Sequence, residues 1–77
     1  MANVKVYSTS SCVYCKMVKD LFKEKGVVYE EYDVYSNEKA REEMKKKSGQ
    51  MGVPVIDIDG EIIIGFDKGR ISELLGI

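Results

Sequence analysis

A β-hairpin near the end of the chain is the strongest structural signal in this sequence. Residues 55–58 (VIDI) and 61–64 (EIII) are short runs rich in β-branched residues, and Asp59-Gly60 separates them. Asp-Gly is a preferred pair for the two-residue type I′ turn that joins antiparallel strands. An isolated hairpin is barely stable in water. We therefore expect these two strands to extend a sheet that other parts of the chain begin.

The first third of the chain predicts a strand, a helix and a second strand. Valines alternate with lysine in residues 3–7 (NVKVY), and residues 27–34 (VVYEEYDV) are rich in β-branched and aromatic residues. Between them the apolar residues follow helical spacing, up to an expected end at Gly26: Tyr14, Met17, Val18, Leu21 and Phe22. A strand, helix and strand in this order form a right-handed crossover with parallel strands.

Two further helices complete the predicted order. Residues 38–48 (EKAREEMKKKS) follow two possible N-caps, Ser36 and Asn37, and Gly49 comes directly after them. The last helix should begin after Asp67 and end at Gly76. The predicted fold class is α/β in the order β-α-β-α-β-β-α. With 77 residues, the chain forms one domain, residues 1–77.

The charge balance argues against nucleic acid or an anionic membrane as a partner. Twelve basic and thirteen acidic residues give a net charge of −1. The lysines of residues 45–47 follow acidic residues at helical spacing, and the expected pairs Glu42–Lys46 and Glu43–Lys47 predict a solvated helix face. Asp57, Asp59 and Glu61 are expected as polar turn residues. No apolar run approaches the roughly 20 residues of a membrane span, and the start lacks a signal-peptide pattern. We expect a cytoplasmic protein.

The two cysteines lie where the first predicted strand meets the first predicted helix. Cys12 falls at the helix N-terminus, where free backbone N–H groups and the helix dipole favour a thiolate, and Lys16 adds positive charge one turn later. Cys15 falls at the edge of the apolar helix face, while Cys12 faces water. Side chains three residues apart on a helix are close enough to form a disulfide after a small adjustment. We assign Cys12 as the nucleophile and Cys15 as the resolving thiol.

Other uses of two cysteines remain open at this point. A zinc site takes about four ligands, and two cysteines without any histidine nearly exclude it within one chain. A metal or iron–sulfur cluster shared by two chains, and two purely structural cysteines, are the alternatives. A single Cys-x-x-Cys pair in a reducing compartment is more typical of redox chemistry.

Three segments of the sequence resemble the glutaredoxin branch of the thioredoxin-fold superfamily. They are residues 6–15 (VYSTSSCVYC), Asp33-Val34 and residues 52–67 (GVPVIDIDGEIIIGFD). A Cys-x-x-Cys pair followed about forty residues later by Val-Pro, and then by Ile-x-Gly-Phe-Asp, is a specific combination. The resemblance implies a thioredoxin fold, with a four-stranded mixed sheet and helices on both faces.

The resemblance also implies roles for individual residues. Pro54 matches a cis proline that faces the cysteine pair, and Val53 matches a residue whose backbone pairs with a substrate peptide or glutathione. Tyr14 matches an active-site tyrosine, and Asp67 and Lys68 open a helix whose N-terminus could bind a carboxylate. Tyr14, Lys16, Val53, Pro54, Asp67 and Lys68 are therefore the predicted substrate-binding residues.

The implied activity is dithiol exchange in electron transport and cell redox homeostasis. The substrate would be a protein disulfide or a glutathione mixed disulfide, and glutathione or thioredoxin reductase would be the electron source. We expect a monomer without bound cofactor or metal; the alternative is a cluster-binding dimeric glutaredoxin that carries a [2Fe-2S] centre.

The sequence departs from the glutathione-using pattern at four places. Val13 replaces the proline between the cysteines, Thr9 replaces a basic residue, Met51-Gly52 replaces Arg-Thr, and Gly65-Phe66 replaces Gly-Gly. Methionine cannot make the bidentate carboxylate contact of an arginine. Gly-Phe is also similar to the glutaredoxin-like electron donors of ribonucleotide reductase, which thioredoxin reductase reduces.

Overall fold

The computed structural model describes residues 3–77 and contains all seven predicted elements in the predicted order. Among these described residues, no helix is long and apolar enough to cross a membrane. The elements are β1 (Val4–Ser8), α1 (Val13–Glu24), β2 (Glu30–Asp33), α2 (Glu38–Ser48), β3 (Val55–Ile58), β4 (Glu61–Ile64) and α3 (Lys68–Leu75).

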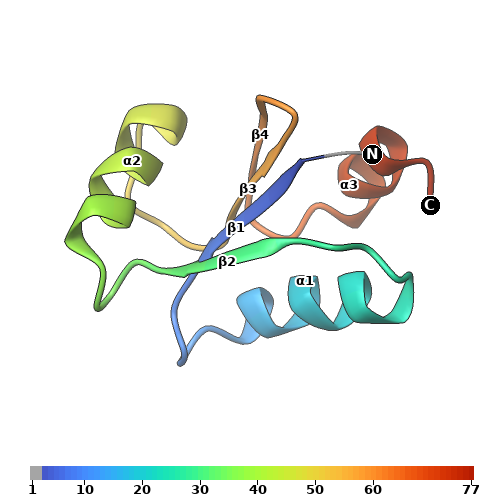
Figure 1. Ribbon diagram of the computed structural model, residues 1–77, viewed down its shortest axis with the longest axis horizontal. Coiled ribbons are helices and arrows are strands. Elements are labelled where there is room, and N and C mark those ends of the chain that lie inside the picture. The colour runs from blue at the N-terminus through green and yellow to red at the C-terminus, as the bar shows by residue number, and fades with distance from the viewer. Residues whose placement is uncertain (1–2) are drawn as a thin grey trace.

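The four strands form one mixed sheet in the order β2-β1-β3-β4 (Figure 1). β1 pairs in parallel with β2 and antiparallel with β3, and β3 pairs antiparallel with β4. The β3–β4 turn has φ values of 52° at Asp59 and 90° at Gly60, so both residues are left-handed, as a type I′ turn requires. The hairpin prediction is confirmed, and the hairpin extends a sheet that β1 begins.

The second strand is shorter than the sequence predicts. It begins at Glu30 rather than at Val27, because the chain is still completing α1 at residue 27. The Val27 N–H donates to the Phe22 carbonyl at 2.8 Å, and the Gly26 N–H donates to the Lys23 carbonyl at 3.3 Å. These two bonds are the C-terminal closure of a helix that ends in a left-handed glycine. Residues 27–29 then cross from the helix to the sheet.

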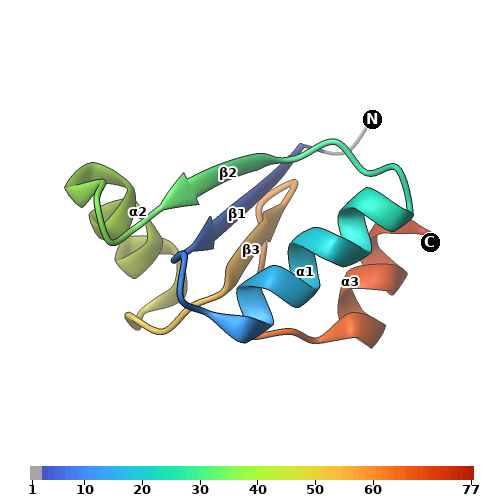
Figure 2. The same ribbon diagram turned by 90° about the horizontal axis from the view of Figure 1, so that it is seen from below.

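The helices cover both faces of the sheet, as predicted. Figure 2 shows α1 and α3 together on one side and α2 apart from them on the other. Each face has its own buried cluster. The cluster under α1 and α3 contains Val4, Val6, Val18, Leu21, Phe22, Ile56, Ile58, Ile63 and Ile71. The cluster under α2 contains Tyr7, Val34, Ala40, Met44 and Val55.

Each helix begins at a residue whose side chain accepts a backbone hydrogen bond. Asn37, rather than Ser36, caps α2 by accepting from the Ala40 N–H at 3.0 Å, and Asp67 caps α3 by accepting from the Arg70 N–H at 3.1 Å. The N-cap of α1 is Cys12. The first helix is therefore capped by a sulfur where the other two are capped by oxygen.

Candidate active site

Cys12 lies at the point where the loop after β1 enters α1. Its backbone is extended, with φ −93° and ψ 116°, and its Sγ accepts a hydrogen bond from the Cys15 N–H at 3.1 Å. The N–H groups of the first helical turn and the positive end of the helix dipole meet at this position. The side chain is partly exposed and is a free thiol. The sulfur is therefore accessible to a reactant from solvent.

Cys15 lies one turn further along α1 and is fully buried. Burial, followed by a hydrogen bond and a charge interaction with Cys12, raises the pKa of its thiol to about 12, whereas a backbone contact at Thr9 opposes the shift. The thiol of Cys15 therefore keeps its proton at neutral pH. An exposed first cysteine and a buried second one are the arrangement that the helical phase predicts.

The loop before β3 brings a second chain segment to Cys12. The peptide bond between Val53 and Pro54 is cis, and the Val53 carbonyl oxygen lies 3.9 Å from Cys12 Sγ. The Pro54 carbonyl in turn accepts from the Gly65 N–H at 2.8 Å. Three segments therefore meet here: the start of α1, the loop before β3 and the turn after β4.

Tyr14 and Lys16 project from the first turns of α1 toward solvent. Tyr14 is 61% exposed. The Lys16 ammonium lies 3.7 Å from Asp20 Oδ2, in a pair whose side chains are 79% and 59% exposed. Its ammonium is thus directed along the helix toward Asp20. A role of either residue in substrate binding stays a prediction.

Asp67 and Lys68 lie at the start of α3, across from α1. Lys68 and Phe66 face α1 across a shallow groove of about 420 Å³, whose other lining residues are Met17, Asp20, Leu21 and Glu24. Phe66 also packs against the buried cluster under α1 and α3. The groove places Lys68 near the exposed side of α1, and its binding role remains a prediction.

Lys19, which the sequence analysis did not single out, is the lysine that acts on Cys15. Its ammonium is 2.8 Å from Glu31 Oε2, and the buried Ser8 hydroxyl donates to the same oxygen at 3.3 Å. The positive charge of Lys19 is among the effects that lower the pKa of Cys15 against the larger effect of burial. Lys19 follows Cys15 by four residues, a helical spacing that could have pointed to it.

A polar network under α2 corrects two expectations. Lys47 does not belong to a solvated face, because its ammonium lies 2.7 Å from Asp57 Oδ2, 3.0 Å from Glu43 Oε1 and 3.0 Å from the Tyr7 hydroxyl. Asp57 is not only a turn residue. It is 8% exposed, and Oδ1 accepts from the Gly60 N–H at 2.8 Å while Oδ2 binds Lys47. The predicted Glu43–Lys47 pair is confirmed, but within a network that spans α2, β1 and β3.

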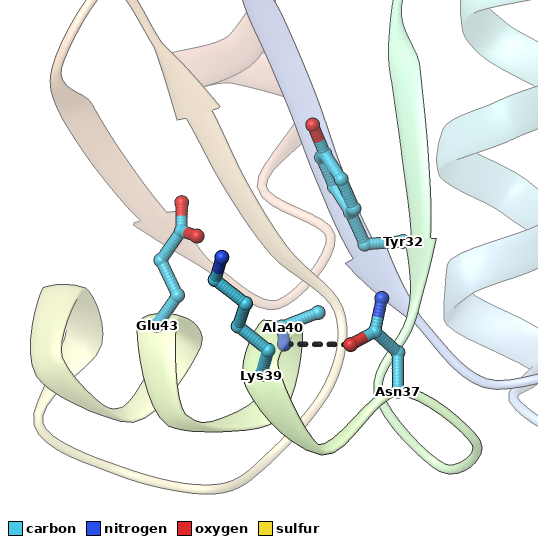
Figure 3. A pocket seen from close by; sticks show the side chains of 5 residues that line it. All are labelled: Tyr32, Asn37, Lys39, Ala40 and Glu43. Carbon is cyan, nitrogen blue, oxygen red and sulfur yellow. Dashed lines mark hydrogen bonds between the residues drawn. The ribbon is translucent and has the colours of Figure 1, made fainter.

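A second hollow, of about 240 Å³, lies between β2 and α2 (Figure 3). Figure 3 shows the Asn37 side chain turned to the Ala40 N–H. The Tyr32 hydroxyl donates to Glu30, and Glu43 accepts from Tyr7. Throughout the described chain, every buried side-chain polar atom has a partner, and no three potential ligands among Cys, Asp and Glu converge on a metal position.

Comparison with known proteins identifies the family of the chain. The family model "Glutaredoxin" matches residues 4–63. A glutaredoxin-like 8.6 kDa protein in a rubredoxin operon of Clostridium pasteurianum is 46% identical over 72 residues, which cover 94% of this chain and 96% of that protein. Glutaredoxin 3 of Escherichia coli K12 is 45% identical over 67 residues, which cover 87% of this chain and 81% of that protein.

Solved structures share the fold over the whole chain. A mutant of the thioredoxin-like protein BC3987 superposes with a TM-score of 0.93 at 34% identity, covering 100% of this chain and 99% of that one. A glutaredoxin from Archaeoglobus fulgidus gives a TM-score of 0.87 at 28% identity, covering 97% and 87% of the two chains. The sheet and its three helices are therefore a thioredoxin-like fold. The chain belongs to the glutaredoxin family.

Proposed function

We propose that this protein reduces protein disulfides by dithiol exchange through Cys12 and Cys15. One observation carries the proposal: a partly exposed sulfur at a helix N-terminus has a fully buried thiol one turn behind it. The Cys15 N–H donates to Cys12 Sγ at 3.1 Å, so Cys12 Sγ lies over the helical turn that carries Cys15. Cysteines three residues apart on a helix can form a disulfide after a small adjustment. The family's thiol–disulfide chemistry supports the same reading.

In the first step the Cys12 thiolate attacks one sulfur of a partner disulfide. A new bond forms between Cys12 Sγ and that sulfur, the partner's S–S bond breaks, and the other partner sulfur leaves as a thiolate that takes a proton from solvent. Helix N-terminal N–H groups stabilise the attacking anion before the reaction. Cys12 is the residue suited to this step because its sulfur is the accessible one.

In the second step Cys15 loses its proton and attacks Cys12 Sγ. The Cys12–Cys15 bond forms, the mixed disulfide breaks, and the partner leaves with two thiols, two electrons richer. Two of the causes that raise the pKa of Cys15, after burial, are its hydrogen bond and charge interaction with Cys12. The hydrogen bond and the charge interaction both weaken once Cys12 is bonded to the substrate, because its sulfur is then no longer an anion. The resolving thiol therefore becomes easier to ionise when it is needed.

The partner segment would lie along Val53. Val53 precedes β3, so its backbone is outside the sheet, and no backbone–backbone hydrogen bond involves it within residues 3–77. An extended peptide could use these groups as it would the edge of a sheet. Tyr14 and Lys16 on α1, and Asp67 and Lys68 on α3, would contact the same substrate on either side.

The electron source that returns the Cys12–Cys15 disulfide to dithiols would be glutathione or thioredoxin reductase. A structural neighbour, a buckwheat glutaredoxin at 28% identity, was solved in complex with glutathione. In this chain Met51 is 49% exposed where a glutathione-using relative would present arginine, and Phe66 lines the groove beside α1. These apolar groups favour a protein reductase over glutathione, because the two carboxylates of glutathione would find no arginine here.

Two experiments test the proposal. Cys15→Ser should accumulate a mixed disulfide between Cys12 and a disulfide-bridged peptide, visible by intact mass, and Cys12→Ser should show no exchange. Retention of exchange by Cys12→Ser would contradict the assignment. Reduction of the oxidised protein by NADPH with thioredoxin reductase, and not with glutathione and glutathione reductase, would identify the electron source; the opposite result would make it a glutathione-dependent glutaredoxin.

A further inference from the structure

In the loop between α2 and Pro54, the Gln50 side chain binds the backbone of Gly52. Its Oε1 accepts from the Gly52 N–H at 2.6 Å, and its Nε2 donates to the Gly52 carbonyl at 3.0 Å. One amide thus binds both backbone groups of one residue. A Cβ on Gly52 would lie only 2.6 Å from Gln50 Oε1, so the clamp needs a glycine at this position.

The clamp is tied to the end of α2 through Ser48. The Ser48 hydroxyl donates to the Met44 carbonyl at 2.7 Å. It also lies 3.4 Å from both the backbone nitrogen and Nε2 of Gln50, which donate to it. Because Met44 is fully buried in the cluster under α2, this chain of hydrogen bonds anchors the loop to the packed part of the molecule.

The clamp has a consequence for Val53, the residue beside Cys12. The Gly52–Val53 peptide is planar and trans, so the Val53 N–H points opposite to the Gly52 carbonyl. Gln50 Nε2 holds that carbonyl on its own side of the loop. The Val53 N–H is therefore turned away from Gln50, and it makes no backbone–backbone hydrogen bond in the described part of the chain.

We infer that Gln50 is a positioning residue that fixes the Val53 backbone for pairing with the partner peptide. The inference rests on the proposed function, in which that peptide lies along Val53. Gln50 itself takes no part in sulfur chemistry. Without the clamp, the Gly52–Val53 peptide could rotate, and each binding event would then have to order it again.

Two disulfides separate this role from a general effect on the fold. A disulfide-bridged hexapeptide offers a backbone to Val53, whereas 2-hydroxyethyl disulfide has no peptide groups and reports only the reactivity of Cys12. The measurement is the second-order rate constant of the reduced protein with each reagent, by stopped flow. Loss of both hydrogen bonds to Gly52 should lower the rate with the peptide roughly tenfold in Gln50→Ala. The rate with 2-hydroxyethyl disulfide should stay within about twofold, because the Cys12 thiolate is unchanged.

A second set of variants tests the geometry of the clamp. Gly52→Ala pushes the Gln50 amide away, so it should slow the peptide reaction as Gln50→Ala does, and the double variant should be no slower than either. Gln50→Glu keeps the acceptor for the Gly52 N–H and loses the donor to its carbonyl, so its rate should lie between wild type and Gln50→Ala. It also serves as the test variant if Gln50→Ala does not fold. Lys46→Ala, an exposed change on α2, is the matched control with unchanged rates.

The possible outcomes distinguish this inference from the proposed function. Equal slowing with both disulfides, additive effects in the double variant, or no change with the peptide would overturn the role of Gln50. If Cys12→Ser still reduced either disulfide, the proposed function itself would fail. If Cys12→Ser is inactive but Gln50→Ala slows the reactions with both disulfides equally, the inference about Gln50 fails and the proposed function stands.

Discussion

The two polar sites of this protein are built in opposite ways. Under α2, the network of Tyr7, Glu43, Lys47 and Asp57 gives every charged group a partner within 3.0 Å. At Cys12, the sulfur has one hydrogen bond at 3.1 Å and a distant contact to the Val53 carbonyl at 3.9 Å. In the first site each charge already has its partner, whereas the second site has room for one.

The difference follows from what each site must do. A charge inside a protein is tolerated only when it is paired and hydrogen-bonded, so a network that connects helix to sheet has to be complete. A nucleophile needs an approach path and free bonding capacity. We therefore expect changes in the α2 network to affect stability, and changes at Cys12 to affect activity.

Cys12→Ser should produce the largest effect and separate the two sites most clearly. Exchange should be lost completely, because a serine hydroxyl at neutral pH is not an anion and cannot form a disulfide. The free energy of unfolding should change by less than about 0.5 kcal/mol, because serine is a favoured N-cap. Activity with a peptide disulfide and urea unfolding measure the two quantities. A large loss of stability would mean that the Cys12 site also supports the fold.

Lys47→Met should produce the opposite pattern. The methionine keeps most of the side-chain volume but leaves Asp57 and Glu43 without their cation. We expect the free energy of unfolding to fall by about 2 kcal/mol, at the lower end for hydrogen bonds to charged groups because Lys47 is partly exposed. The exchange rate per folded molecule should not change. An unaltered urea midpoint would show that the network does not stabilise the protein.

Alkaline pH should destabilise the reduced wild-type protein more than it destabilises the Cys15→Ser variant. Burial, together with Cys12, raises the pKa of the Cys15 thiol to about 12, so the folded state holds this proton more tightly than the unfolded chain. This contribution to the free energy of unfolding is fully present below the ordinary thiol pKa. It is lost as the pH rises toward the pKa of Cys15 in the folded state. By pH 10 the wild-type protein should have lost about 1 kcal/mol more of its free energy of unfolding than the variant. Thermal unfolding of both proteins from pH 8 to 10 checks this, and parallel curves would contradict it.

Asp57→Asn should remove part of the acid sensitivity of the fold. Burial alone would raise the pKa of Asp57, but hydrogen bonds from Lys47 and the Gly60 N–H lower it. The Tyr7 hydroxyl and Lys47 lower the pKa of Glu43. The contributions of Asp57 and Glu43 to the free energy of unfolding are present above the ordinary carboxyl pKa. They are lost as the pH falls through the lowered pKa values of the folded state. Asp57→Asn should cost about 1 kcal/mol at pH 7, and the gap to wild type should narrow below about pH 4.

Lys16→Ala should produce the smallest change in stability. Both side chains of its ion pair with Asp20 are exposed to solvent. Such pairs contribute from nothing to about 0.5 kcal/mol to the free energy of unfolding. The same variant tests whether Lys16 acts on Cys12. A slower reaction with iodoacetamide at neutral pH would support that role. An unchanged rate would leave the helix N-terminus as the local source of positive potential.

Local patterns in the sequence predicted most of the fold. The Asp59-Gly60 turn, the spacing of apolar residues in α1 and the caps at Asn37 and Asp67 each depend on residues a few positions apart. The assignment of the exposed and buried cysteine follows from helical phase in the same way. The largest boundary error, the start of β2, arose because Val27 has high strand propensity but closes α1.

What the sequence could not predict depends on contacts made by the tertiary fold. Lys47 and Asp57 meet only because α2 packs over β3, and Tyr7 joins them from β1, forty residues away from Lys47. Nothing in the run of three lysines distinguishes Lys47 from the other two. The Gln50 clamp is local, yet Gln-x-Gly has no strong structural preference of its own, so the clamp becomes apparent only in the folded structure.

The sulfur cap of α1 gives the protein an internal reporter of its own oxidation state. The Cys15 amide hydrogen is held by Cys12 Sγ, and an anionic sulfur accepts a hydrogen bond far better than a sulfur in a disulfide. Each turnover should therefore loosen and restore the first turn of the helix. The amide resonance of Cys15 and its exchange with deuterium would follow that cycle directly, in a mixture with any partner, without a label on either protein.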